Sequence, residues 1–178
     1  MNFNAAQSEM RRAYVNGGIG VLVSGIVWII AGLVTQNMSF QLGMAALFFG
    51  SMAIHPVAVL IERVAYKRPK VTAPNLMEML ALQTTPILFV GLFAGFLVSK
   101  DNPGWFFGIA LLAVGARYLI FQTIYGMRHY AVLGFALIAI GFVAIWYLYM
   151  PPHLVAITGG VTELFFSIAL LRRTESVF

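Results

Sequence analysis

The sequence predicts an all-α integral membrane protein, a polytopic bundle of six transmembrane helices with both termini in the cytoplasm. Of its 178 residues, 61% are hydrophobic and only 10% are charged, whereas a soluble domain carries about 25% charged residues. The apolar residues form six runs, each close to the ~20 residues that a spanning helix needs. The runs follow one another closely, so residues 1–178 are expected to form a single transmembrane domain.

Six helices are expected in turn, each closed by polar residues or by proline. The boundaries are the polar turn 35–37, the basic stretch 62–70, the turn 99–103, Arg128, Pro151 and Arg172. Strands are excluded because the spans of a barrel are short and alternate in polarity. The expected helices cover residues 17–34, 39–61, 76–98, 104–125, 130–150 and 154–171.

Positive charge is distributed unequally between the two ends of such a bundle. If six helices alternate in direction, nine basic residues fall on one side and only Lys100 on the other. Cytoplasmic loops carry the excess of lysine and arginine, so both termini are expected in the cytoplasm. The net charge of +5 then reports topology, and no nucleic-acid partner is expected. The nine residues are Arg11, Arg12, Arg63, Lys67, Arg68, Lys70, Arg128, Arg172 and Arg173.

Aromatic residues mark the opposite interface. Trp105 and Phe106 begin the fourth expected helix, and Trp146, Tyr147 and Tyr149 end the fifth. Tryptophan and tyrosine are enriched where a membrane meets water. These residues are therefore expected in an interfacial belt, with ordinary lipid-facing aromatic side chains as the alternative.

Four ionisable side chains lie inside the expected helices: His55, Glu78, Arg117 and Glu163. A charge at mid-membrane costs about 2.5–3.5 kcal/mol on insertion scales, so such residues are rare and are functional by default. Counted at ~1.5 Å per residue from the cytoplasmic basic residues, all four fall in one layer of the inner half of the bilayer. A single polar site is expected there, with Tyr118 and Gln122 as neighbours.

Arg117 is expected to form an ion pair. Arginine stays charged even when it is buried, so it needs a carboxylate or water. Glu163 is the leading partner and Glu78 the second. The glutamate left unpaired would sit neutral and could carry a proton. The alternative is a salt bridge that only fixes the register of two helices.

Two prolines are expected to disturb helices near this layer. Pro56 and Pro86 cannot donate an amide hydrogen, so each leaves a carbonyl without its helical partner. Such irregular backbone at membrane depth often lines a cavity, although a kink can also serve packing alone. The spacings Gly91-x-x-x-Gly95 and Gly104-x-x-x-Gly108 favour close helix approach, either within the chain or at a dimer face.

Catalytic and cofactor motifs are missing from the sequence. There is no cysteine, no zinc-protease or phosphate-loop motif and no mid-membrane lysine for a Schiff base. A Ser-His-Asp triad lacks its acid, because Asp101 is the only aspartate and lies in a loop. No catalytic residue, metal ligand or cofactor is therefore assigned.

Three stretches resemble an uncharacterised family, a domain of unknown function in small bacterial membrane proteins. They are residues 102–106 (Asn-Pro-Gly-Trp-Phe), 115–119 (Gly-Ala-Arg-Tyr-Leu) and 125–134. The family is also known for a hydrophobic second helix with a central proline before a basic loop, similar to Pro56. The resemblance covers most of the chain. It implies six helices and a bacterial origin, hence the inner membrane, but no function.

The leading functional expectation is a proton-linked transporter or binding protein for a small solute. Arg117 would hold an anionic group, Glu163 or Glu78 would exchange a proton, and His55 with Tyr118 would orient the ligand. The alternatives are a structural or accessory membrane subunit and an intramembrane lipid-modifying enzyme. The expected partners are membrane lipids, a small-molecule ligand and further copies of the chain in a homo-oligomer, because a bundle of six such helices encloses little volume.

Overall fold

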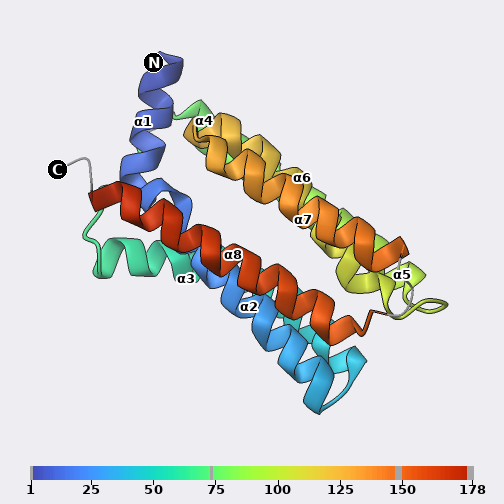
Figure 1. Cartoon of the computed structure of the whole chain (residues 1–178). Coiled ribbons are helices and arrows are strands. Elements are labelled where there is room, and N and C mark those ends of the chain that lie inside the picture. Colours follow the sequence, from blue (N-terminus) through green and yellow to red (C-terminus); the bar gives the residue numbers. More distant parts are fainter. Residues whose placement is uncertain (1, 73, 147–149, 176–178) are drawn as a thin grey trace.

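The chain is helical in the part that the structure describes (Figure 1). The computed structural model describes residues 2–72, 74–146 and 150–175, with side chains up to residue 172. A short helix and one 3-10 turn precede the long segments. The elements are α1 (Phe3–Ala13), η1 (Val15–Gly17), α2 (Gly18–Asn37), α3 (Phe40–Val64), α4 (Leu76–Gln83), α5 (Thr85–Val98), α6 (Trp105–Tyr125), α7 (Arg128–Trp146) and α8 (Pro152–Glu175).

Six segments of the described residues are long and apolar enough to cross a membrane, which confirms the predicted six-helix membrane bundle. The third segment, Leu76–Val98, is divided into α4 and α5 at Thr84. Pro86 lies in the first turn of α5, where a missing N–H is tolerated but the helix cannot continue from α4. α3 instead runs unbroken through Pro56.

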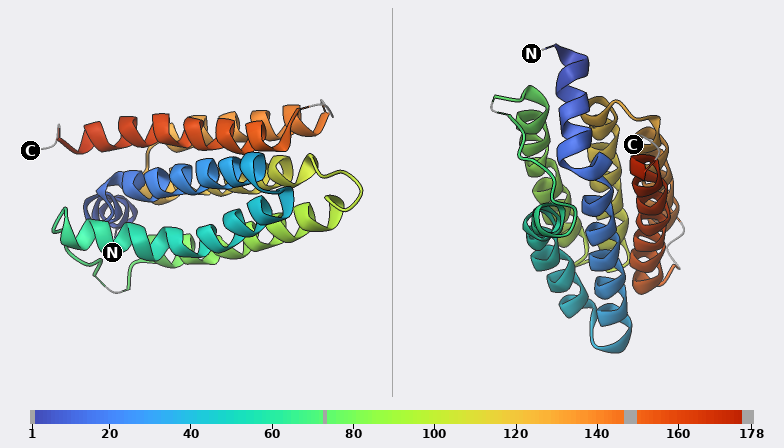
Figure 2. Two further views of the ribbon diagram at one scale, coloured as in Figure 1. Left: turned by 90° about the horizontal axis from the view of Figure 1, so that it is seen from below. Right: turned by 90° about the vertical axis from the view of Figure 1, so that its left-hand side faces the viewer.

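The six spans form two units of three helices, each with a central helix. α2 packs between α3 and α8, and α6 packs between α5 and α7. Figure 1 shows α2 beside α8 and α6 beside α7, and Figure 2 shows α8 and α3 on opposite sides of α2. α2 runs away from the end that holds both termini, whereas α6 runs toward it. We call them the α2 unit (α2, α3 and α8) and the α6 unit (α5, α6 and α7).

Glycines let the helices within each unit approach closely. A Cβ on Gly25 of α2 would lie 2.8 Å from the carbonyl oxygen of Gly160 on α8, and one on Gly160 would lie 2.7 Å from that of Gly25. Gly115 of α6 and Gly134 of α7 face each other in the same way, at 2.7 and 2.8 Å. Small residues at such crossings allow backbone to meet backbone.

The glycine spacings that could have marked a dimer face serve packing within the chain. Gly91 of α5 faces Ala113 of α6, and Gly95 faces the backbone of Phe106. Gly108 of α6 faces the carbonyl oxygen of Gly141 on α7. Gly91, Gly95 and Gly108 are covered in the monomer, whereas a Cβ on Gly104 would meet only the Met150 carbonyl oxygen, at 3.9 Å. The dimer interpretation is therefore wrong for Gly91-x-x-x-Gly95 and stays a prediction for the second motif.

Aromatic side chains join the two units at the end away from the termini. The ring centroid of Trp28 on α2 lies 6.1 Å from that of Phe107 on α6, and Phe40 of α3 lies 6.3 Å from Phe106. Phe106 is only 3% exposed, so its predicted place in an interfacial belt is wrong. Trp146 is 84% exposed. The other two predicted belt residues, Tyr147 and Tyr149, lie outside the described residues.

Helix α1, which the sequence did not predict, closes the opposite end of the bundle against α4 and α6. Gln7 Nε2 donates to the carbonyl oxygen of Thr123 and Arg11 Nη1 to that of Tyr125, each at 2.5 Å. Carbonyls in the last turn of a helix lack a helical partner, so α1 supplies one. Gly126 follows with a φ of 64°, the left-handed conformation that ends many helices.

The junction between α1 and α2 is a sharp break in the backbone. Val15, Asn16 and Gly17 have successive φ values of 49°, 57° and 74°, and a β-branched residue rarely adopts such a value. Two hydrogen bonds from the bundle hold the break. Tyr130 Oη donates to the Asn16 carbonyl oxygen at 2.7 Å, and Asn16 Nδ2 donates to the Leu170 carbonyl oxygen at 3.2 Å.

Candidate functional site

Glu163 is buried where α8 of the α2 unit meets α6 of the other unit. Its side chain is 0% exposed, and Oε1 accepts a 2.8 Å hydrogen bond from the Tyr118 hydroxyl. Oε2 is also buried and has no hydrogen-bond partner. The buried hydroxyl of Ser24, on α2, lies beside the carboxyl group. The contact between the units thus holds a carboxyl group with one unused acceptor.

Arg117 lies on another side of α6. Its Nε donates to Thr84 Oγ1 at 3.0 Å, at the break between α4 and α5. The guanidinium carbon lies 4.9 Å from the centroid of the Phe121 ring, a cation–π contact. Among the described residues, no carboxylate pairs with Arg117. Its charge therefore has polar and aromatic neighbours but no counterion.

The expected ion pair between Arg117 and Glu163 is not formed. Consecutive residues of an α-helix point about 100° apart, so α6 directs Tyr118 toward α8 and Arg117 toward α4 and α5. Arg117 is still near enough for its charge to act on Glu163. The group that contacts Glu163 is a tyrosine hydroxyl, and the predicted pairing is wrong.

His55 and Glu78 lie on the Arg117 side of α6. His55 is exposed on α3, and the charges of Arg117 and Glu78 both act on it. Glu78 Oε1, the second expected partner of Arg117, accepts a hydrogen bond from the Tyr14 hydroxyl instead. Burial, and then this bond, raise the pKa of Tyr14 well above its usual value. His55 and Glu78 thus lie on the side of α6 that carries Arg117 and Glu163 lies on the side that carries Tyr118, while the charge of Arg117 acts on both His55 and Glu163.

Aromatic rings fill the space between the two groups. Tyr130 lies 5.9 Å from Tyr118 and is stacked on Tyr125 at 5.1 Å, centroid to centroid. Phe121, which contacts Arg117, lies 5.7 Å from Tyr130. Glu62 of α3 is 2% exposed, its charge acts on Tyr125 and Tyr130, and its Oε2 has no hydrogen-bond partner. A second carboxyl group with an unused acceptor therefore lies near the C-terminal end of α3.

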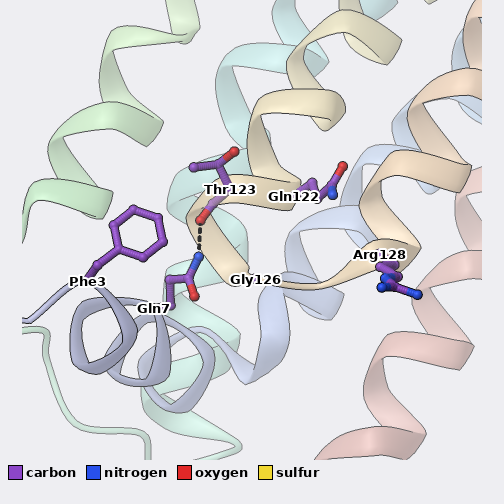
Figure 3. A pocket seen from close by; sticks show the side chains of 6 residues that line it. All are labelled: Phe3, Gln7, Gln122, Thr123, Gly126 and Arg128. Carbon is purple, nitrogen blue, oxygen red and sulfur yellow. Dashed lines mark hydrogen bonds between the residues drawn. The ribbon is translucent and has the colours of Figure 1, made fainter.

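Gln122 belongs to neither group. It is exposed and lines a surface pocket of about 330 Å³ between α1, the end of α6 and the start of α7 (Figure 3). The other lining residues are Phe3, Gln7, Thr123, Gly126 and Arg128. In Figure 3 the hydrogen bond from Gln7 to the Thr123 carbonyl oxygen crosses one wall of the pocket. This position separates Gln122 from the intramembrane residues with which it was grouped.

Sequence patterns did not reveal Tyr14 and Ser24. Tyr14 precedes the first expected span, and only the break at residues 15–17 brings it back to Glu78. Ser24 is a lone serine in an apolar helix, a position at which serine is common in membrane packing. Its only sequence signal is that it lies next to Gly25, where α2 meets α8.

Comparison with known proteins assigns the chain to a family. A search of the curated proteins and of the solved structures finds no match to the chain. A family model does match, over residues 3–173, a range that includes both groups of polar residues. The resemblance to an uncharacterised domain family is thereby confirmed. The chain belongs to DUF7010, a family of unknown function.

Proposed function

We propose that this protein moves a small anionic solute across a bacterial cytoplasmic membrane, coupled to the movement of a proton on Glu163. The observation that carries the proposal is the fully buried carboxyl group with an unused oxygen. An ionised carboxylate without a counterion is costly in an apolar medium, whereas the neutral acid is tolerated. Tyr118 can remain bonded to Glu163 in either state because a hydroxyl both donates and accepts.

The position of Glu163 supports a carrier mechanism. Many carriers place the coupling site between two helix units and alternate its access by rocking one unit against the other. Here Glu163 and Tyr118 come from different units, and the central helices α2 and α6 run in opposite directions. A rocking motion would break their hydrogen bond and open the carboxyl group to one side. Both termini would be cytoplasmic.

Arg117 is the proposed anion-binding residue. Its planar guanidinium matches a carboxylate or phosphate with two parallel hydrogen bonds, and among the described residues only its Nε is hydrogen-bonded, to Thr84. Aromatic rings connect this side of α6 with Tyr118 and Glu163, so binding and proton exchange could be coupled through α6. We further propose a homo-oligomer, since six helices of this length enclose little volume.

Proton movement in proteoliposomes tests the proposal. Vesicles loaded with the pH dye pyranine would receive inorganic phosphate, succinate or hexyl phosphate, and the expected result is a change in internal pH with at least one of them. Glu163→Gln should abolish the change while the protein stays folded, and Asp101→Asn, in an exposed loop, should not. An unaltered change in internal pH with Glu163→Gln would contradict the proposal and favour a structural subunit held together by the Tyr118–Glu163 hydrogen bond.

A further inference from the structure

We propose that the anion bound by Arg117 is an anionic lipid, which enters sideways from the bilayer between the inner half of α3 and helices α4 and α5. The inference rests on the proposed function in taking Arg117 as the anion-binding residue. It replaces the small solute with an amphiphile whose head group bears a net negative charge, and it adds the route by which that ligand reaches the site.

The outer half of α3 is attached to the α6 unit. The ring of Phe48 lies 6.2 Å from that of Phe89 on α5, and Phe40 contacts Phe106 and Phe107. The inner half belongs to a separate apolar cluster with α2 and the α1–α2 junction, formed by Val15, Ile19, Val23, Ala58, Ile54, Ile61 and Leu171. Between Phe48 and Glu62, α3 therefore packs on α2, and Met52 and His55 on its other side are exposed.

Polar side chains from three helices border this region. His55 comes from α3, Thr84 from the break between α4 and α5, and Arg117 from α6. His55 is exposed, and the charge of Arg117 acts on it. A head group that entered between α3 and α4 would meet Arg117 first as a hydrogen-bond donor and His55 as a second donor.

Among the described residues, no carboxylate in this region is free to pair with Arg117. Glu78 is bonded to Tyr14, and Glu62 is only 2% exposed. The charge of Glu163 acts on Arg117, but its carboxyl group is buried and bonded to Tyr118 on another side of α6. Arg63 is turned to the Tyr14 ring and to backbone carbonyls. A guanidinium at membrane depth requires an anion or water, and a phosphate accepts two of its N–H groups at once. The missing partner is therefore an anion from outside the chain.

The region is bordered by α3 on one side and by α4 and α5 on the other, and these two walls favour a lipid over an anion dissolved in water. In the apolar 18-residue window of each span, only 11% of the α3 residues and 17% of the α4–α5 residues are buried, against 56% for the span that contains α2. Exposed apolar side chains line both walls, among them Met52 on α3 and Leu82 and Phe89 on α4 and α5. Arg117 lies eight residues, or ~12 Å, from the inner end of α6, a distance that a long side chain and a head group can bridge together.

Photo-crosslinking in nanodiscs tests this inference. Discs of phosphatidylcholine would contain a trace of phosphatidylglycerol or phosphatidylcholine with a diazirine in one acyl chain. Crosslinks mapped by mass spectrometry are expected from phosphatidylglycerol on α3 beyond Phe48 and on α4 and α5. Their yield should fall roughly tenfold or more with the phosphatidylcholine probe and in Arg117→Gln, as the loss of a charged hydrogen bond implies. Arg128→Gln, which removes a surface charge at the same end, should keep the full yield.

Further variants and a competition experiment distinguish this inference from its alternatives. His55→Trp leaves Arg117 intact and fills the opening, so it should also remove the crosslinks if Arg117→Gln fails to fold. Displacement of the lipid by millimolar inorganic phosphate would identify a soluble anion as the ligand and overturn the inference. Equal yields from the two lipids would overturn it as well. Proton movement driven by phosphate without any lipid crosslink would overturn this inference alone, whereas lipid crosslinks without proton movement would overturn only the transport proposal.

Discussion

At the residue scale, Glu9 fastens α1 to the loop that leads into α4. Its Oε1 accepts a hydrogen bond from the Thr72 amide and its Oε2 from Asn75 Nδ2, both at 2.7 Å. Hydrogen bonds from Thr72, followed by the bond from Asn75 and the charge of Arg12, lower the pKa of Glu9 from its usual 4.5. An ionised Glu9 therefore adds to the contacts that dock α1.

Acid is expected to release α1. Because the pKa of Glu9 is lower in the folded protein than in the unfolded chain, its contribution to stability is present above about pH 4.5 and is lost as the pH falls through the folded value. A nitroxide on Ser8→Cys, an exposed site, should become more mobile as the pH falls through that range. Glu9→Gln should be mobile already at neutral pH, and Asp101→Asn should follow the original profile. An immobile label in Glu9→Gln would rule out this clamp.

For the polar site, the sequence predicts the depth and charge of a residue such as Arg117 but not the direction in which its side chain points. The depth of Arg117 was predicted from its distance to Arg128 along the chain, and its need for a partner was predicted from its charge. The direction in which it points depends on how α6 is rotated, and packing against α5, α7 and α8 sets that rotation. The rotation that turns Tyr118 toward Glu163 turns Arg117 toward Thr84, which apolar periodicity alone could not predict.

At the element scale, α2 provides a matched test of glycine packing. A side chain on Gly25 would collide with the Gly160 carbonyl oxygen and Leu164, whereas nothing lies within 4 Å of a Cβ on Gly20. Gly25→Val should lower the free energy of unfolding by about 1–3 kcal/mol through overpacking. Gly20→Val, on the same helix, should change it little. Denaturant unfolding in detergent measures both, and equal stability of the two variants would contradict the close contact of α2 with α8.

The sequence predicted where helices end better than it predicted which segments pack against each other. The break at Thr84 follows from Pro86, since a proline fixes the first turn of a helix. α1 escaped prediction because its Phe3–Ala13 sequence is polar on average and only three of its residues are buried, Ala6, Met10 and Ala13. Its place is set by contacts with distant carbonyls of α6. Contacts of that kind leave no local pattern in the sequence.

At the scale of the whole molecule, the α2 unit and the α6 unit, whose central helices run in opposite directions, share few polar contacts. Length and hydropathy predict six spans, but lipid-exposed and packed apolar residues look alike in a sequence. The grouping of α8 with α2 rather than with α7 therefore came only from the structure. That grouping puts Glu163 between the units, and it makes the orientation of the bundle in the membrane decisive for the direction in which a proton would travel.

Cysteine labelling on intact bacteria would determine that orientation. The chain has no cysteine, so a membrane-impermeant maleimide reports only the introduced one. Lys100 lies between α5 and α6, at the end away from the termini, and Lys67 lies in the basic loop after α3. Because cytoplasmic loops retain positive charge, Lys100→Cys should be labelled in intact cells and Lys67→Cys only after permeabilisation. The reverse pattern would place the termini outside, and Arg117 would then lie in the outer half of the bilayer, open to the opposite leaflet.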